Sequence, residues 1–347
     1  MTASFKCAVA LGVDIGGTFV KVALVGPGPA VLERARLSMD PAEPPESLLR
    51  RLSGSVSDLE ALVEGSPALP VGVGCAGLID AGAGVVKTSP NLPLWQDVPV
   101  VAALLAGLAC SDGRPRAASA RDGGGPSAVV LDNDANVFSF AEGFYGAAKE
   151  SADAVFVTLG TGVGGGLKLG GRLYTGSCGF AGEIGHTTID PDGPVCACGN
   201  RGCLESFVGS VGIVRRARRI IEEEGRQDEW LRRGLLSLDC LTVKDVGRAA
   251  EAGDGLAIRV FGEVGEYLGV AVANVINLLN PEVVVLGGGV SGAGEPLFSA
   301  VRSTVLRRAL GPSSKCTRIV PALFGEDAGV IGAAMKAASA GGSQRDE

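Results

Sequence analysis

The sequence predicts an α/β protein of two domains built on a related plan, and three observations support this. The chain has 347 residues, whereas a single hydrophobic core stops growing near about 250–300 residues. Hydrophobic residues make up 46% of the chain and aromatic residues only 5%, so it can bury a large aliphatic core. A strand, a turn of Gly with Thr and a returning strand occur once in each half. This repeat suggests two domains that face each other across a cleft.

The strand–turn–strand units are β-hairpins by their residue types. Residues 8–15 and 20–25 read as strands joined by Gly16-Gly17, and residues 31–37 read as a third strand. In the second half, residues 154–159 and 164–169 flank Gly160-Thr161-Gly162. Runs rich in β-branched residues that are bounded by glycine turns are typical of hairpins.

Helical periodicity fills most of the remaining chain. The longest pattern stops at Asn280-Pro281, because a residue before proline disfavours helix. A short buried strand at 283–286 follows and leads into Gly287-Gly288-Gly289. Residues 111–127 show no hydrophobic period and read as a linker or exposed loop. Helices are expected at residues 45–64, 208–224, 243–252, 255–279 and 328–338.

Composition and charge argue against several classes of function. The formal net charge of −7 disfavours nucleic acid and anionic lipid as partners. The basic run from Arg215 to Arg219 is followed by Glu222, and its apolar neighbours share one helical face, which favours a solvated amphipathic helix. No apolar run reaches the ~20 residues of a membrane span. Asp14 breaks the first apolar run, so we expect no signal peptide and a cytoplasmic protein.

The cysteines carry the strongest chemical signal. Three of the nine crowd into eight residues at Cys196, Cys198 and Cys203, and His186 is the only histidine. A lone histidine is more often a packed residue, but thiolates and imidazole together are the ligands of closed, tetrahedral zinc sites. A redox-active cluster is the alternative, although the usual Cys-x-x-Cys spacing is absent. We predict structural Zn²⁺, with Gly199 and Gly202 letting the backbone turn around it.

The two glycine turns are candidates for phosphate binding. Glycine lets backbone N–H groups approach phosphate oxygens, threonine adds a hydroxyl donor, and Asp14 could hold Mg²⁺. The string G-x-G-x-x-G also occurs, from Gly72, Gly160 and Gly287, but a dinucleotide site needs a helix directly after the glycines. A strand follows Gly160 instead. A P-loop is excluded because the chain has no Gly-Lys pair.

Polar residues cluster at two further places. Asp132-Asn133-Asp134 follows an apolar strand, where one carboxylate could accept a proton from a substrate hydroxyl and another residue could cap a helix. Glu183 and Glu205 flank the predicted zinc ligands. They could bind sugar hydroxyls, or they could support His186 or be solvated.

Taken together, these motifs resemble the ROK family of bacterial repressors and sugar kinases, in particular its glucokinases. The resemblance runs from Asp14 to about Gly332 and includes, in order, Ser89-Pro-Asn91-Leu-Pro-Leu-Trp95, Asn133-Asp134-Ala-Asn136, Glu183-Ile-Gly-His186 and Gly202-Cys203-Leu-Glu205. It implies the actin-like ATPase (ribonuclease H-like) fold, with two lobes around a central cleft and a structural zinc loop. The expected lobes are residues 1–132, joined by a terminal helix at about 327–347, and residues 133–326.

The resemblance also implies ATP-dependent phosphorylation of glucose at its 6-hydroxyl, with Asp134 as general base. The residues implied to contact the sugar are Gly77, Asn91, Asn133, Asp134, Glu183, His186 and Glu205. Those implied to surround the ATP phosphates and Mg²⁺ are Asp14, Gly16, Gly17, Thr18, Lys21, Gly160, Thr161 and Gly162, with Gly287, Gly288 and Gly289 near the adenosine. The family often has Pro-Gly where this chain has Ala76-Gly77, and we expect little effect because Gly77 is kept.

Several alternatives remain open within and beside this family. The sugar could instead be N-acetylglucosamine, N-acetylmannosamine or fructose, and polyphosphate could replace ATP. A repressor would carry a helix-turn-helix domain before the kinase-like core, which the short segment before Asp14 does not favour. A zinc-containing sugar-binding protein without catalysis is a further alternative, although Asp134 is retained. Homodimers are common in the family, so a homodimer is expected.

Overall fold

Each of two structural units in the chain is organised by its own five-stranded sheet. The structure is a computed structural model and describes residues 9–63, 68–89, 92–112 and 128–341. The first unit comprises Met1–Glu150, Leu173–Ala181 and Glu326–Glu347, and the second comprises Ser151–Arg172 and Gly182–Gly325. The predicted division at residues 132 and 133 stays a prediction.

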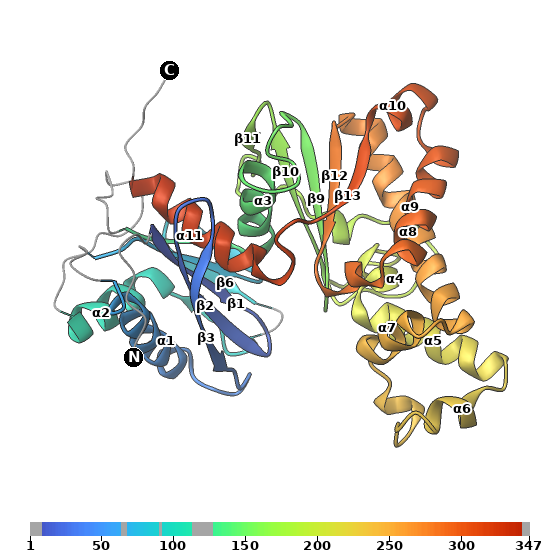
Figure 1. Cartoon of the computed structure of the whole chain (residues 1–347), viewed down its shortest axis with the longest axis horizontal. Coiled ribbons are helices and arrows are strands. Elements are labelled where there is room, and N and C mark those ends of the chain that lie inside the picture. Colours follow the sequence, from blue (N-terminus) through green and yellow to red (C-terminus); the bar gives the residue numbers. More distant parts are fainter. Residues whose placement is uncertain (1–8, 64–67, 90–91, 113–127, 342–347) are drawn as a thin grey trace. The chain divides into compact units, whose positions relative to one another are not determined.

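The first unit contains the sheet with strand order β3-β2-β1-β4-β8 and a smaller sheet of β5, β6 and β7. Figure 1 labels β1, β2 and β3 of the larger sheet and β6 of the smaller one. β1 pairs antiparallel with β2 and parallel with β4, so the predicted first hairpin is confirmed. The elements of this unit are β1 (Ala10–Ile15), β2 (Phe19–Val25), β3 (Val31–Ser38), α1 (Pro45–Glu60), β4 (Val71–Cys75), β5 (Leu78–Asp80), β6 (Val85–Thr88), β7 (Gln96–Val98), α2 (Val100–Asp112), β8 (Val129–Asn133), α3 (Asp134–Phe144) and α11 (Ala328–Gly341).

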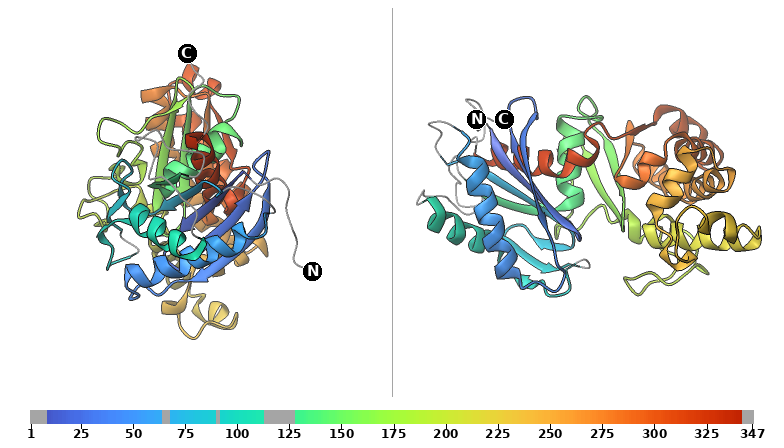
Figure 2. Two further views of the ribbon diagram at one scale, coloured as in Figure 1. Left: turned by 90° about the vertical axis from the view of Figure 1, so that its left-hand side faces the viewer. Right: turned by 60° about the horizontal axis from the view of Figure 1, so that its bottom comes forward.

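The two faces of this first sheet are packed differently. Leu11 and Val13 belong to a hydrophobic cluster with side chains of α1 and α2 on one face. On the other face Gly12 and Gly72 are register partners, and a methyl group on either would lie 1.8 Å from a backbone oxygen of α11. Because neither glycine has a side chain, α11 lies directly on β1 and β4. The segment at the end of the chain thereby becomes part of the first unit (Figure 2).

The second unit contains the sheet with strand order β11-β10-β9-β12-β13. β9 and β10 form the second predicted hairpin, and β12 runs parallel to β9. The elements are β9 (Ala154–Leu159), β10 (Val163–Leu169), β11 (Arg172–Leu173), the 3₁₀ helix η2 (Ile184–His186), α4 (Glu205–Val208), α5 (Ser210–Glu223), α6 (Gln227–Leu231), η3 (Leu238–Cys240), α7 (Val243–Glu251), α8 (Gly255–Leu279), β12 (Val283–Gly287), η4 (Gly289–Ala293), α9 (Glu295–Arg308), α10 (Gly311–Cys316), β13 (Arg318–Pro321) and, at the junction with the first unit, η5 (Gly325–Asp327).

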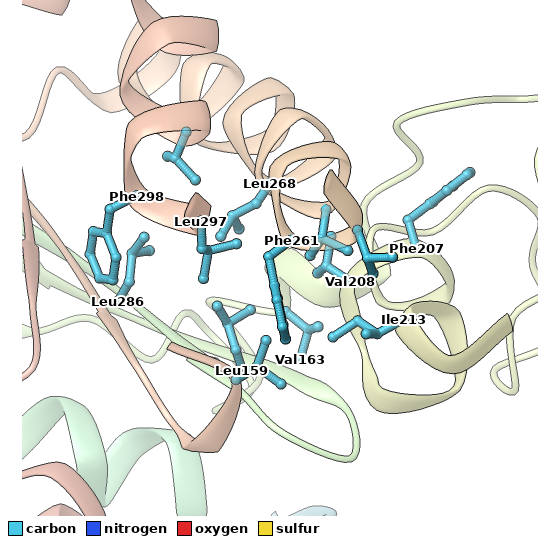
Figure 3. Close-up of a cluster of buried hydrophobic side chains, with 14 of the residues drawn as sticks. Leu159, Val163, Phe207, Val208, Ile213, Phe261, Leu268, Leu286, Leu297 and Phe298 are labelled. Atoms are coloured by element: carbon cyan, nitrogen blue, oxygen red, sulfur yellow. The ribbon is translucent and has the colours of Figure 1, made fainter. Parts of the chain in front are cut away.

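The core of the second unit holds the glycine turn of the hairpin in place. Figure 3 shows Leu159 and Val163, which flank that turn, in one cluster with Phe261 of α8. Phe261 is 1% exposed, and truncating a buried phenylalanine to alanine typically costs about 3–5 kcal/mol. The strands that enter and leave the turn are therefore held by packing against this core.

The ends of two predicted helices can be compared with the structure. The predicted helix at 255–279 is present as α8, and Asn280 closes it with a left-handed φ of 46° ahead of Pro281. The predicted helix at 208–224 is present as α5, which begins two residues later than expected, at Ser210, because Gly209 is extended. The reason is tertiary, because the Ser210 N–H bonds the Gly160 carbonyl (3.1 Å). Among the described residues no helix has the length and apolar composition needed to cross a membrane.

Candidate functional site

His186, Cys196, Cys198 and Cys203 form one cluster in the second unit. Their potential ligand atoms all lie within 4.8 Å of one another. Cys196 Sγ is 3.9 Å from His186 Nδ1, and Cys198 Sγ is 3.7 Å from Cys203 Sγ. The sequence spacing thus predicted correctly which four side chains come together.

A compact backbone turn brings these ligands into place. The Cys196 N–H bonds the Asn200 carbonyl at 2.8 Å, and an isolated bridge pairs Thr188 with Cys203. Gly199 and Gly202 have φ values of 89° and 65°, which L side chains rarely adopt. A methyl group on Gly202 would also lie 1.5 Å from the Asp190 carbonyl oxygen. The predicted role of these glycines in turning the chain is therefore confirmed.

The geometry fits a tetrahedral metal ion. With a zinc–sulfur distance of about 2.3 Å, two sulfurs of a tetrahedron lie about 3.8 Å apart, close to the 3.7 Å between Cys198 Sγ and Cys203 Sγ. Burial raises the pKa of the Cys196 thiol to about 12, and burial likewise raises the pKa of Cys203. A hydrogen bond from the Asn200 backbone lowers the pKa of Cys198. A cation that binds thiolates would offset the cost of ionising the two buried sulfurs and release their protons.

Glu205, the first residue of α4, connects this cluster to the glycine turn. Its Oε2 accepts a hydrogen bond from the Val163 N–H at 2.9 Å, and its Oε1 lies 3.7 Å from Cys196 Sγ. A methyl group on Gly162 would lie 2.4 Å from Oε2. The carboxylate therefore sits directly under the Gly160–Gly162 turn, a position that sequence spacing did not predict.

The glycine segments of the second unit meet at one edge of its sheet. β9 and β12 are parallel neighbours, with Gly287 in register with Thr158, so their carboxyl ends lie together. Gly288 has a φ of 83°, and a methyl group there would lie 2.3 Å from the Leu159 carbonyl oxygen. Ser210 joins the same edge because its hydroxyl donates to the Gly160 carbonyl at 2.8 Å. Thr161, Gly288 and Gly289 are exposed.

A groove of about 1050 Å³ begins beside this edge. Its walls come from α5, η3 and the start of α7, and its lining includes Ser210, Arg215, Arg218, Asp239, Thr242 and Lys244. α7 packs against η4, which follows Gly288 directly. The groove, the Gly160 turn and the Gly287–Gly289 segment thus belong to one neighbourhood of the second unit.

In the first unit a row of polar residues crosses the sheet on the α11 face. Asp14 is the register partner of Lys21 on β2 and of Gly74 on β4, and Gly74 is the partner of Asp132 on β8. Asp14 is half-buried, and a methyl group on Gly329 of α11 would lie 2.7 Å from its Oδ2. Burial raises the pKa of Asp14, and the nearby Lys21 partly offsets this. Lys21 Nζ also donates to the Glu326 carbonyl at 3.0 Å.

The start of α3 holds the remaining predicted residues of this unit. Asn133 caps the helix, since its Oδ1 accepts from the N–H groups of Ala135 (2.8 Å) and Asn136 (3.3 Å). Its Nδ2 donates to the Gly77 carbonyl at 3.0 Å. Asp134 is the first helical residue, and its Oδ1 also lies 2.9 Å from the Ala135 N–H. The hypothesis that one residue of this motif caps a helix is therefore confirmed, with Asn133 in that role.

Gly77 and Cys75 complete this edge of the sheet. Gly77 has a φ of 121°, and a methyl group there would lie 2.2 Å from the Thr88 carbonyl oxygen, so only glycine fits. Cys75 ends β4 between Ile15 and Asn133. Burial, followed by the carboxylates of Asp134 and Asp14, strongly raises the pKa of its thiol. Asp14 and Asp134 thus lie at one edge of the first sheet, because β1, β4 and β8 are parallel and their carboxyl ends lie together.

Three further outcomes concern the predicted site residues. Asn91 and residues 113–127 of the predicted loop lie outside the described residues. Glu183 is exposed and precedes η2, and His186 at the end of η2 is exposed as well. Lys336, Ser210 and Val163 contact the site residues but were not predicted, because their partners lie 204, 50 and 42 residues away.

Comparison with known proteins places the chain in a family. The family model described as "ROK family" matches residues 10–112 and 126–339. A glucokinase from Thermotoga maritima is 35% identical over 93% of this chain and 95% of its own length. A xylose repressor from Caldicellulosiruptor bescii is 30% identical over 86% of this chain and 70% of its own length.

A solved structure matches the fold of this chain over nearly the same length. It is a ROK family glucokinase from Streptomyces griseus in complex with glucose and AMPPNP, with a TM-score of 0.78 and 30% identity, and the match covers 94% of this chain and 98% of that one. The chain belongs to the ROK family. Its two-sheet α/β architecture is the actin-like fold of that family, and its His-Cys cluster matches the ROK zinc-binding motif.

Proposed function

We propose that this protein is an ATP-dependent sugar kinase that phosphorylates the 6-hydroxyl of glucose, giving glucose 6-phosphate and ADP. The observation that carries the proposal is Glu205, whose carboxylate touches both the metal cluster and the backbone of the Gly160–Gly162 turn. This links a candidate sugar-binding group to a candidate phosphate-binding group. The glucokinases among its relatives, one of them solved with glucose and AMPPNP, support the same assignment.

Sugar recognition is assigned to polar groups of both units. In the second unit these are the carboxylates of Glu183 and Glu205 and the free ring nitrogen of His186. In the first unit they are Asn133 and the backbone of Gly77, together with Asn91. Asn133 Nδ2 donates one hydrogen to Gly77 and keeps a second for a ligand, because an amide nitrogen has two.

The cluster of His186 and three cysteines would hold a structural Zn²⁺. When bound, such an ion closes the loop and contributes folding free energy. His186 would bind through Nδ1, the atom that lies 3.9 Å from Cys196 Sγ. Its Nε2 is then the nitrogen left for a hydrogen bond to a sugar hydroxyl.

Nucleotide binding is assigned to the glycine edge of the second unit and to Asp14. Backbone N–H groups of the Gly160–Gly162 turn and the Thr161 hydroxyl would donate to phosphate oxygens. The groove beside Ser210, and Gly287–Gly289, would take the nucleoside. Gly16, Gly17, Thr18 and Lys21 are assigned to the phosphates as well. Asp14 would hold Mg²⁺, directly or through water, and that ion would neutralise charge on the phosphates.

In the proposed reaction Asp134 accepts the proton of the sugar 6-hydroxyl. The oxygen forms a bond to the γ-phosphorus, the bond from that phosphorus to the β–γ bridging oxygen breaks, and ADP leaves. Little covalent chemistry falls to the protein, so positioning and charge stabilisation supply most of the rate. We propose that the active protein is a homodimer in the cytoplasm, as expected from the sequence.

The specific sugar is tested by ADP release from ATP and Mg²⁺ across glucose, fructose, mannose and the N-acetylated sugars. We expect glucose to give the highest kcat/KM. Faster turnover of N-acetylglucosamine or N-acetylmannosamine would replace glucose and keep the kinase. Two results would contradict the assignment as a sugar kinase: ADP release in the absence of sugar, or no ADP release with any sugar of the panel. Either result would favour a sugar-sensing protein, as the repressor relative suggests. Polyphosphate in place of ATP tests the donor.

A further inference from the structure

A partly buried ion pair connects α11 to the segment that carries Asp134. Lys336 of α11 contacts Asp132 Oδ2, and the side chains are 26% and 7% exposed. Asp132 ends the row of register partners on the α11 face of the sheet: it pairs with Gly74, and Gly74 pairs with Asp14. Its position in the sequence, two residues before the proposed base, makes this pair relevant to the reaction.

The other carboxylate oxygen of Asp132 holds the start of α3. Oδ1 accepts from the Asn133 N–H at 2.7 Å and from Asn136 Nδ2 at 2.9 Å. Asn133 in turn binds the N–H groups of Ala135 and Asn136. These bonds tie down the backbone on both sides of Asp134. The Ala135 N–H is shared by Asn133 Oδ1 and Asp134 Oδ1, at 2.8 and 2.9 Å, so a shift of Asn133 changes a contact of Asp134.

α11, which carries Lys336, packs closely against α3 and the first sheet. A methyl group on Gly332 would lie 1.8 Å from the Val137 carbonyl oxygen of α3, so the two helices are in backbone contact. Gly329, near the start of α11, approaches Asp14. One helix therefore contacts the proposed magnesium-binding carboxylate, the helix of the proposed base and, through Lys336, the carboxylate that orders that helix.

We propose that Lys336 is a positioning residue for phosphoryl transfer, acting through Asp132 on the orientation of Asp134. This rests on the proposed function. A buried carboxylate that loses its partner cation either rearranges or leaves a charge uncompensated. Either change releases Asn133 and Asn136, and misplacing a catalytic group by about 1 Å can cost about 10²-fold in rate.

The test compares four variants of the full chain: Lys336→Met, Lys336→Arg, Asp132→Asn and the double variant Asp132→Asn/Lys336→Met. We expect Lys336→Met to lower kcat for the best sugar about 10–100-fold with little change in KM. Lys336→Arg, which keeps the cation, should recover most of this loss. The double variant should be no slower than the slower single variant, because both single changes disrupt the same ion pair. Lys315→Met, at an exposed lysine of α10, is the surface control.

Melting curves and far-UV circular dichroism, with rates measured well below each Tm, separate folding from positioning. The double variant removes both charges of the Lys336–Asp132 pair, so neither is left without its partner, and it keeps the test decisive if Lys336→Met unfolds. A wild-type kcat in Lys336→Met, or losses that add in the double variant, would overturn the proposal. A wild-type chain inactive on every sugar would instead refute the proposed function.

Discussion

The Glu205 carboxylate accepts the Val163 N–H at 2.9 Å while its other oxygen lies 3.7 Å from Cys196 Sγ. Val163 is the first residue of β10, immediately after the Gly160–Gly162 turn. One side chain thus joins the metal cluster to the segment proposed to bind phosphate. Damage to the cluster should therefore affect nucleotide binding as well as sugar binding.

Replacing Glu205 tests this connection. Glu205→Gln keeps the shape but weakens an acceptor that takes a backbone N–H, so we expect kcat/KM to fall about 10–100-fold for both ATP and sugar. Steady-state kinetics with each substrate varied in turn measures the effect. Glu223→Gln, at a surface residue of α5 that pairs with Arg219, should behave as wild type. A loss confined to the sugar would contradict the connection.

Asp134→Asn tests the proposed base. The amide cannot accept the proton of the sugar hydroxyl, so we expect kcat to fall about 10²–10⁴-fold with sugar binding retained. Rapid-quench or steady-state assays give the rate, and calorimetric titration gives sugar affinity. Asp58→Asn, at an exposed position of α1, is the matched control. An Asp134→Asn variant with wild-type turnover would exclude this residue as the base.

Two glycines of one turn should respond differently to a methyl group. At Gly162 it would meet Glu205 Oε2 at 2.4 Å, whereas at Gly160 no heavy atom from the described part of the chain lies within 4 Å, its two chain neighbours aside. Gly162→Ala should lower both Tm and activity. Gly160→Ala should leave Tm near the wild-type value but raise KM for ATP about 10-fold if phosphate occupies that open space. An unchanged KM for ATP in Gly160→Ala would argue against phosphate binding at this turn.

Metal content tests the cluster. Elemental analysis of protein purified without chelator should find about one zinc per chain, and Cys198→Ser should lose most of it and lower Tm. Cys316→Ser, at an exposed free cysteine outside the cluster, should keep both. Wild-type protein without zinc would contradict the assignment of a structural zinc.

The pH dependence of stability should include a contribution from Asp254. Burial alone would raise the pKa of this carboxyl, but the Ala257 N–H and the guanidinium groups of Arg233 and Arg226 outweigh it, so its pKa lies below the ordinary value. A carboxyl whose pKa is lower in the folded state stabilises the fold at pH values above its pKa in the unfolded chain, about 3.9. This stabilisation is lost as the pH falls from that value through the pKa of the folded state. Urea unfolding of wild type and Asp254→Asn should therefore differ at pH 7 and converge toward pH 3. An equal difference at both pH values would contradict this.

How far the sequence could predict the structure depended on how local the determinants are. The metal ligands lie within one short segment, and both hairpins are pairs of adjacent strands, so spacing and residue type were sufficient. The start of α5 was predicted two residues too early, because Ser210 bonds Gly160, fifty residues earlier in the chain. Lys336 was missed because an ordinary helical lysine becomes informative only when its partner is known to be Asp132.

The glycines show the same difference between local and distant determinants of structure. Gly199 and Gly202 were recognised because they lie between cysteines in the sequence. Gly12 and Gly72 have no such context, yet their missing side chains let α11 lie on the first sheet. Packing of a distant segment is invisible to local pattern analysis, whereas chemistry carried by neighbouring residues is not.

Transfer of a phosphoryl group from ATP to a sugar hydroxyl defines the proposed activity, and analysis of the products detects that transfer itself. Wild-type protein with zinc retained, incubated with ATP, Mg²⁺ and glucose, should form glucose 6-phosphate and ADP in equal amounts, as resolved by phosphorus NMR. ADP without sugar phosphate, or unchanged ATP with glucose and with every other sugar of the panel, would show that the protein is not a sugar kinase.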